Sequence, residues 1–198
     1  EHALLGREKP MAVGAYATPP YYIESKRLQA QAMLDAKQVI LDVAAEFKKW
    51  TGRSYDLIEK YQMDDAEEAI VIIGSSAGTA KETVNEMRAQ GHKVGLIKIR
   101  AFRPFPGAEI TAALKNVKAY AVMDKADSFN GHCGPLFAEV AAAAMVAGVT
   151  TPKVINYIYG LGGRDVRVES IAHVFTELEN IAKTGNVGET YRYLDVRE

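Results

Sequence analysis

The chain begins with a long helical pattern of apolar positions and continues with short apolar runs. Within residues 25–50, apolar side chains recur every three or four residues, at Leu28, Ala32, Ala36, Val39, Ile40, Val43, Phe47 and Trp50. Lys48 and Lys49 in the last turn, with Gly52 after them, are typical of a helix end. At about 1.5 Å per residue this helix is about 40 Å long, so we expect part of it to lie outside the main body. We expect its apolar stripe to face a core, because that is commoner than a cofactor-binding role.

The rest of the chain alternates between apolar runs and amphipathic helices. The runs are typical of buried parallel strands and lie at residues 69–74, 93–99, 119–123 and 154–159. The spacing between and after them predicts helices within residues 76–91, 110–114, 134–148 and 171–185. Strands joined by crossover helices imply the α/β class, with a largely parallel sheet covered by helices on both faces.

The ends of these helices carry their own signals. Ser76 is a candidate N-cap, Pro135 suits a first helical position, and Asp165 is a candidate cap for the last helix. In the helix within residues 134–148 we expect four side chains to face inward, namely Leu136, Val140, Ala144 and Ala147.

Three segments outside this alternation give weaker signals. Residues 1–22 lack periodicity and hold three prolines, so we interpret them as an extended arm lying on another surface, or else as a flexible terminus. Residues 55–61 are a weak strand or a linker, and the acidic cluster within residues 64–68 favours a solvated turn over a metal site. The tail shows no helical pattern, and Tyr191 and Tyr193 are its candidate anchors.

Composition narrows the class of protein. The 198 residues include 24 Lys and Arg, 25 Asp and Glu and 48% hydrophobic residues, as in a soluble domain with an appendage. The formal charge of −1 gives no support to a nucleic-acid partner or an anionic membrane. No apolar run approaches the roughly 20 residues that span a bilayer and no signal peptide is seen, so we expect a cytoplasmic protein. A first Met only at Met11 suggests a processed or excised piece.

The single cysteine excludes several kinds of site within the chain. One thiol forms no internal disulfide and cannot alone hold an iron–sulfur cluster or a structural zinc ion. Cys133 follows His132, so a Cys/His nucleophile is conceivable. It is disfavoured because adjacent side chains rarely point at each other and no third group orients them. A loop shaped for contact is the better interpretation of residues 124–134.

Four loops lie where an open α/β sheet binds ligands, beyond the carboxyl ends of its strands. Small residues in the first loop could hold an anion, and we take them as weak cofactor-binding candidates: Gly74, Ser75, Ser76, Gly78 and Thr79. The loop lacks the G-x-G-x-x-G spacing and a Walker lysine, so a tight turn is the simpler interpretation. A Gly74–Ser75 pair at this strand end also disfavours a receiver-type signalling domain, which needs acidic residues there.

The other loops carry charged residues suited to an interface or to the rim of a site. Arg100 and Arg103 can clamp a phosphate or carboxylate, or pair with acidic groups of a neighbouring subunit, and we slightly favour the subunit. Three glycines within residues 160–165 allow close backbone approach beside Arg164 and Asp165, by a phosphate or by a protein. The full set of interface or rim candidates is Arg100, Arg103, Asp127, Asn130, Arg164 and Asp165.

Taken in order, these motifs resemble the 2-oxoacid:ferredoxin oxidoreductases. The closer similarity is to the C-terminal region of the α subunit of pyruvate:ferredoxin oxidoreductase, or pyruvate synthase. The resemblance covers nearly the whole chain and rests on residues 69–79, 103–106, 127–139, 160–165 and 196–198. The glycine-rich 160–165 motif is its most specific part.

The resemblance implies a fold and a domain division. It implies a transketolase C-terminal-like domain with a five-stranded sheet in the order 1-3-2-4-5, in which residues 55–61 form the one antiparallel strand. We therefore expect an arm and connecting helix at residues 1–54, this domain at 55–185 and a tail at 186–198.

The resemblance also implies an anaerobic-type oxidative decarboxylation of a 2-oxoacid, with electrons passing to ferredoxin. The holoenzyme would use thiamine diphosphate, Mg, 4Fe-4S clusters and CoA, none of which we expect this chain to bind alone. It has no Gly-Asp-Gly motif, no cluster cysteines and no pyrimidine-binding domain. We assign it no catalytic or metal-binding residue. The implied partners are a pyrimidine-binding domain, a thiamine diphosphate-binding β subunit, and γ and ferredoxin-like δ subunits.

Three functions stay open at this point. The chain is an assembly domain of such an oxidoreductase, with pyruvate favoured over other 2-oxoacids or oxalate. Alternatively it is a free-standing module that binds a phosphorylated ligand or nucleotide at residues 74–79. A weaker hypothesis gives it a contact to CoA through Arg164.

Overall fold

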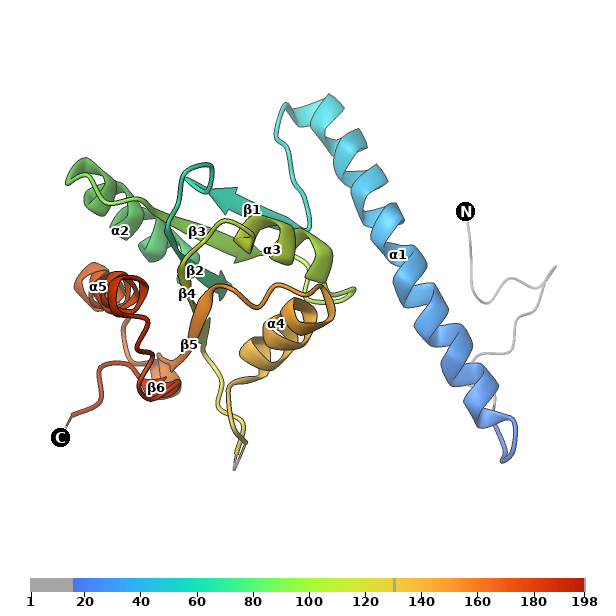
Figure 1. Ribbon diagram of the computed structural model, residues 1–198. Coiled ribbons are helices and arrows are strands. Elements are labelled where there is room, and N and C mark those ends of the chain that lie inside the picture. The colour runs from blue at the N-terminus through green and yellow to red at the C-terminus, as the bar shows by residue number, and fades with distance from the viewer. Residues whose placement is uncertain (1–15, 130, 198) are drawn as a thin grey trace.

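A long helix stands beside an α/β domain in this chain. The computed structural model describes residues 16–129 and 131–197 (Figure 1). Helix α1 (Tyr22–Thr51) leads into the domain, and it begins and ends close to the predicted positions. The arm predicted for residues 1–22 lies mostly outside the described residues.

One sheet forms the middle of the domain. Within the described residues its strand order is β1-β3-β2-β4-β5-β6. Strand β1 runs antiparallel to β3, and the other neighbours are parallel. The strands are β1 (Ile58–Tyr61), β2 (Glu68–Ile73), β3 (Val94–Ile99), β4 (Ala119–Asp124), β5 (Lys153–Ile158) and β6 (Tyr191–Tyr193). The implied order 1-3-2-4-5 and the antiparallel first strand are confirmed.

The sheet has one strand more than the five expected. Strand β6 comes from the predicted tail and pairs with β5 through Asn156, Tyr157 and Ile158. Three residues are too few to show a period-two pattern, so no strand signal is visible in the tail. The strand exists because the edge of β5 offers it hydrogen-bonding partners.

Helices cover both faces of the sheet, as predicted. They are α2 (Ala77–Ala89), α3 (Gly107–Leu114), α4 (Pro135–Val146) and α5 (Val168–Thr184). Side chains on one face of β2, such as Ile70 and Ile72, pack with α2 and α5. Ala69 and Val71 point to the other face and pack with α3 and α4, which Figure 1 shows opposite α2 and α5. Each central strand is therefore buried on both sides, which explains its continuous apolar run.

Some predicted helix ends are confirmed and others are wrong. Pro135 is in the first turn of α4, and Gly52 and Gly185 end α1 and α5 with φ of 73° and 72°. Ser76 precedes α2, but its backbone is already helical and its side chain makes no capping hydrogen bond. Asp165 does not cap α5, because the chain stays extended through Arg167 and the helix begins after it. Ala147 was expected to face inward, but it lies just past α4 and is exposed.

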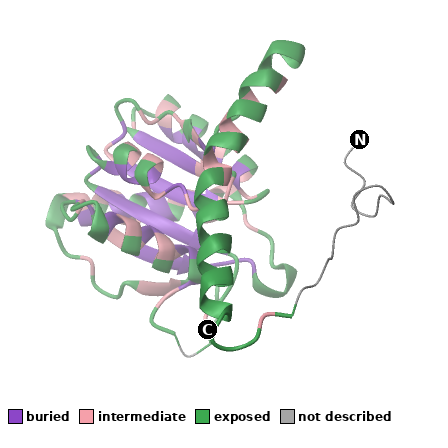
Figure 2. Cartoon of the chain, turned by 90° about the vertical axis from the view of Figure 1, so that its right-hand side faces the viewer, coloured by how far each residue is buried: buried purple, intermediate pink, exposed green. Residues whose placement is uncertain are grey.

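Helix α1 contradicts the expectation that its apolar stripe faces a core. None of its residues is buried. Figure 1 shows the helix standing beside the domain, and Figure 2 shows it exposed along most of its length. Its contacts with the domain include Lys37, whose ammonium lies 2.6 Å from the Glu109 carboxylate, and Phe47, whose ring centre lies 5.7 Å from that of Tyr55. The expectation that part of the helix lies outside the main body is confirmed. In the described residues, no helix combines the length and apolarity that crossing a bilayer requires.

Candidate interface at the carboxyl edge of the sheet

A buried polar network holds the loop that follows β4. Asp124, at the end of that strand, accepts hydrogen bonds from the backbone N–H groups of Leu136 at 2.6 Å and Phe137 at 3.1 Å. Its carboxylate therefore caps the start of α4 from a distant position in the sequence. Asn156 on β5 donates to Asp124 Oδ2 at 2.9 Å and accepts from the backbone N–H of Gly134 at 2.7 Å. The network fixes both ends of the 125–134 loop.

Burial sets the electrostatics of this network. It raises the pKa of Asp124, while the N–H donors of Leu136 and Asn156 oppose the rise. Burial and then the Asp124 charge raise the pKa of the Cys133 thiol. A nucleophilic cysteine needs the opposite shift, because the thiolate is the reactive form. The environment of Cys133 therefore fits the interpretation that disfavours a Cys/His nucleophile.

Glycine is required where the loop enters α4. A Cβ at Gly134 would lie 2.3 Å from Cγ of Asp124, well inside van der Waals contact. The sequence pattern marked Gly134 only as the residue before a helix. The close approach is caused by the carboxylate of Asp124, which lies at the end of β4.

The first part of the same loop is tied to the C-terminal tail. Asp127 accepts hydrogen bonds from the hydroxyls of Tyr191 and of Tyr193, the latter at 2.8 Å. These bonds lower the pKa of Asp127, so the carboxylate stays ionised. The prediction that Tyr191 and Tyr193 anchor the tail is confirmed. Asp127 thus has an internal partner at this edge of the sheet.

Arg164 and Asp165 lie at a second junction with the tail. Arg164 follows the short 3-10 helix η1 (Leu161–Gly163) and donates to the backbone oxygen of Asp195. It also lines a surface recess of about 670 Å³ with Asp165, Arg167 and Arg197. The glycines before it adopt left-handed φ, as the loop pattern allowed: 66° at Gly160 and 82° at Gly163.

Arg100 and Arg103 have acidic partners on other elements of the chain. Arg100 donates to Glu59 on β1 at 2.7 Å, and its guanidinium lies 5.0 Å from the ring centre of Tyr55. Arg103 pairs with Glu139 on α4 and stacks on Phe102 at 4.3 Å. The two arginines do not converge on a common point, and each has an acidic partner within the chain. Asn130 lies outside the described residues.

The 74–79 loop forms a tight turn into α2. Gly74 has a φ of 88°, and the N–H of Gly78 donates to the oxygen of Ser75 at 2.9 Å. The remaining weak candidates, Ser76 and Thr79, lie at the start of the helix. The recess of about 670 Å³ and a second one of about 590 Å³ are both lined by other residues.

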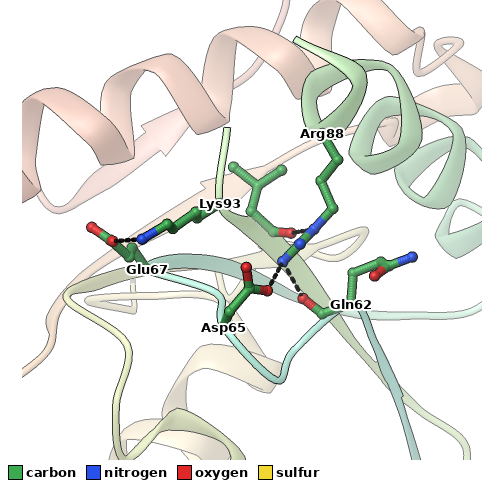
Figure 3. Close-up of polar contacts among 6 residues, drawn as sticks. Gln62, Asp65, Glu67, Arg88 and Lys93 are labelled. Atoms are coloured by element: carbon green, nitrogen blue, oxygen red, sulfur yellow. Dashed lines mark hydrogen bonds and ion pairs between the residues drawn. The ribbon is translucent and has the colours of Figure 1, made fainter. Parts of the chain in front are cut away.

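Charged side chains form a separate cluster at the opposite, amino edge of the sheet (Figure 3). Arg88 donates to Asp65 Oδ1 and to the backbone oxygen of Gln62, both at 2.7 Å. Glu67 pairs with Lys93 at 2.9 Å and with Lys118. Hydrogen bonds from the two lysines, Lys118 first, lower the pKa of Glu67 to about 2. Two of the four acidic residues of the predicted turn, Asp65 and Glu67, are therefore ion-paired rather than merely solvated.

Glu68, also in the predicted acidic turn, lies in β2 and is buried, and burial raises its pKa. The side chains do not fit a metal site. Across residues 16–129 and 131–197, no three His, Cys, Asp or Glu side chains gather as metal ligands would.

The sequence did not reveal two parts of this edge. Asn156 sits in the middle of an apolar run, and only its polarity within a buried strand could have marked it. Arg192 binds Glu177 at 2.8 Å and the backbone oxygen of Glu189 at 2.6 Å, which clamps β6 beside α5. A single arginine in a tail carries no such signal in the sequence.

The described residues form a three-layer α/β domain. Its C-terminal tail binds the loops at the carboxyl edge of the sheet. Comparison with known proteins places the chain more narrowly. Residues 66–171 match the family model of the pyruvate:ferredoxin oxidoreductase core domain II, and the chain belongs to that family.

Curated relatives extend the match beyond the domain. The chain is 41% identical over 196 residues to the pyruvate synthase subunit PorA of Methanosarcina barkeri, covering 98% of this chain and 48% of the relative. It is 42% identical over 187 residues to the ketoisovalerate oxidoreductase subunit VorA of Pyrococcus abyssi, covering 94% and 47%. The chain thus spans about half the length of the curated relatives it matches.

A solved structure supports the fold. The 2-oxoglutarate:ferredoxin oxidoreductase from Magnetococcus marinus, solved with 2-oxoglutarate, coenzyme A and succinyl-CoA bound, aligns with a TM-score of 0.54. The alignment covers 89% of this chain and 28% of that chain at 18% identity. At this identity the likeness concerns the fold alone.

Proposed function

We propose that this chain is the domain II portion of the α subunit of a 2-oxoacid:ferredoxin oxidoreductase, with pyruvate as the favoured substrate. The observation that carries the proposal is the 41% identity to a pyruvate synthase subunit across 98% of this chain. A ketoisovalerate enzyme subunit matches equally well, so a branched 2-oxoacid is the alternative substrate.

The proposed role is assembly and support of the active-site rim. The charged candidates at the carboxyl edge are held within the chain, as Asp127 is by two tyrosines and Arg103 by Glu139. Such restraint suits residues that present a fixed surface to a neighbouring subunit. Asp127, Arg164 and Asp165 are the residues we propose for that surface, and Arg100 and Arg103 are further candidates.

The chain's own residues do not fit the 4Fe-4S clusters that the family implies. A 4Fe-4S cluster needs four thiolate ligands, and this chain has one cysteine. We therefore propose that thiamine diphosphate, Mg, the clusters and CoA are held by the rest of the complex, in which the chain acts in the cytoplasm. The partners are the pyrimidine-binding domain and the β, γ and δ subunits, with ferredoxin as electron acceptor.

Reconstitution tests this proposal. The chain is combined with the remaining subunits of the enzyme, and pyruvate- and CoA-dependent ferredoxin reduction is measured with and without it. We expect activity only in the complete mixture. Isothermal titration showing tight, stoichiometric thiamine diphosphate binding by the chain alone would contradict the assembly role.

Substitutions at the edge test the proposed surface. We expect Asp127→Ala to weaken assembly, because it frees the tail tyrosines, while Lys60→Ala on the distant β1 edge serves as the control. For Arg164→Ala, assembly and the KM for CoA are both measured, which distinguishes a role in assembly from a contact with CoA. A raised KM for CoA with normal assembly would revive the CoA hypothesis.

A further inference from the structure

Helix α1 carries an apolar stripe that no described part of the chain covers. The exposed fractions are 72% at Leu28, 60% at Val39 and Val43, and 77% at Trp50, the only tryptophan. With Ala32 these positions repeat every 11 residues, as 28–39–50 and 32–43. An 11-residue repeat stays almost in line along a helix with 3.6 residues per turn. The stripe is therefore a continuous ridge of about 33 Å.

This ridge differs from the side of α1 that meets the domain. Ala36, Ile40 and Phe47 are partly buried, and Phe47 contacts Tyr55. At 100° per residue, these three side chains lie to one side of the ridge. The apolar face of α1 is therefore wide, and only one side of it meets the domain.

Acidic side chains border the ridge along one edge. Asp35, Asp42 and Glu46 project within about a quarter turn of it, on the side away from the domain. Two of them are held by glutamines one turn earlier, Asp35 by Gln31 at 2.8 Å and Asp42 by Gln38 at 2.9 Å. A surface that fits this ridge is apolar along its centre and basic along one side.

We propose that this ridge docks the other half of a PorA-type α subunit, the half that the present chain does not span. The inference rests on the proposed function and names a partner for it. The pyruvate synthase relatives are about twice as long as the region they share with this chain, and that region covers 98–100% of this chain, so it includes α1. The domain II model, in contrast, begins only at residue 66. The segment that forms α1 is thus part of the match to these subunits, and the domain of this chain leaves it uncovered.

The charges argue against a second copy of this chain as the occupant. In an antiparallel two-fold pair, each edge of the ridge meets the same edge of its copy. The acidic edges would then face one another, and like charges at such positions oppose pairing. A basic-edged partner has no such penalty.

The test measures binding to a defined probe, the part of the Methanosarcina barkeri subunit PorA that lies outside the match. Val43→Asp breaks the ridge, and Ala45→Asp introduces the same carboxylate at an exposed position on another side of α1. We expect Val43→Asp to raise the Kd at least about tenfold and Ala45→Asp to leave it nearly unchanged. Asp42→Lys should also weaken binding, and more so at low salt.

Folding and self-association are checked in the same samples. Both aspartate variants should keep the wild-type thermal midpoint, because the altered positions are exposed. Trp50 emission should shift to shorter wavelength on binding, measured as the difference between the wild type and Trp50→Phe.

The outcomes separate this inference from the proposed function. Equal binding by Val43→Asp and wild type would overturn the docking ridge, as would an active reconstituted enzyme in which the probe half never contacts α1. Sedimentation showing a dimer that Val43→Asp dissolves would identify a second copy as the occupant and also overturn it. If the wild type neither binds the probe nor restores activity, the proposed function itself fails.

Discussion

Helices α1 and α5 show what an apolar pattern alone does and does not specify. Both were predicted from three- and four-residue spacing, and both form, ending at Gly52 and Gly185 with nearly the same backbone geometry. Five apolar side chains of α5 are buried against the sheet, namely Ile171, Val174, Phe175, Leu178 and Ile181. In α1, which has 30 residues, none is buried.

The difference lies in the surfaces that surround the two helices. Helix α5 lies on the sheet face formed by β2 and β4 and beside α2, so its one apolar stripe meets a matching surface. Helix α1 precedes the strands, and it meets the domain through contacts such as the ion pair of Lys37 with Glu109 on α3 rather than by packing on the sheet. Spacing predicts that a helix has an apolar face, but it does not say whether this chain supplies the covering surface.

The largest expected effect compares one leucine from each helix. Leu178→Ala in α5 removes a fully buried side chain, and we expect it to lower the free energy of unfolding by about 2–5 kcal/mol. Leu28→Ala in α1 should change it by less than about 0.5 kcal/mol, because Leu28 is exposed. Urea denaturation followed by circular dichroism measures both. Equal losses would show that α1 belongs to the folding unit of the domain.

A second prediction tests how closely the domain is packed where α4 begins. Gly134→Ala places a methyl group against the Asp124 carboxylate, and we expect it to lower the free energy of unfolding by about 1–3 kcal/mol. The control is Gly78→Ala in α2, where a new Cβ meets nothing within 4 Å. That variant should be unchanged or slightly more stable in the same urea series. A neutral Gly134→Ala would mean that Asp124 moves freely.

A third prediction applies the same strain to both helices. Gly185→Ala and Gly52→Ala each force an L residue into left-handed backbone at an open position. We expect Gly185→Ala to lower the free energy of unfolding by about 1 kcal/mol and Gly52→Ala by less, because α1 adds little to the core. Calorimetric midpoints of the two variants check this order. The reverse order would contradict the division between α1 and the domain.

The smallest expected effect concerns pH and the domain's charged amino edge. Because the pKa of Glu67 falls from 4.5 to about 2 on folding, its pairing contributes stability above pH 4.5 that is lost as the pH falls towards 2. The wild type should therefore be slightly more stable than Glu67→Gln at pH 6, and this difference in the free energy of unfolding should close by about pH 2. Urea midpoints at pH 6, 4 and 3 measure the gap. A gap that is constant across this range would exclude the ion pairs as its cause.

The sequence identified the protein family by the order of its motifs, not by the apolar spacing that predicted the helices. The order of glycine, arginine and aspartate motifs pointed to the oxidoreductase family, and the family match at residues 66–171 confirmed it. The same motifs did not show which charges meet. Asp127 binds two tyrosines more than 60 residues later, whereas Arg100 and Arg103 turn to separate acidic partners. Contacts of this kind depend on which loops the strand order places together.

The sequence by itself determined the alternation of strands and helices, the buried faces of α2 and α5, and most helix ends. These features follow from local spacing and from residues such as Gly52 and Pro135, whose backbone preferences act without distant partners. Only the tertiary structure decided that the tail adds β6, that Asp124 caps α4, and that α1 stays uncovered. Each of these depends on whether a distant part of the chain supplies a surface or a hydrogen-bonding group, and local spacing carries no record of such partners.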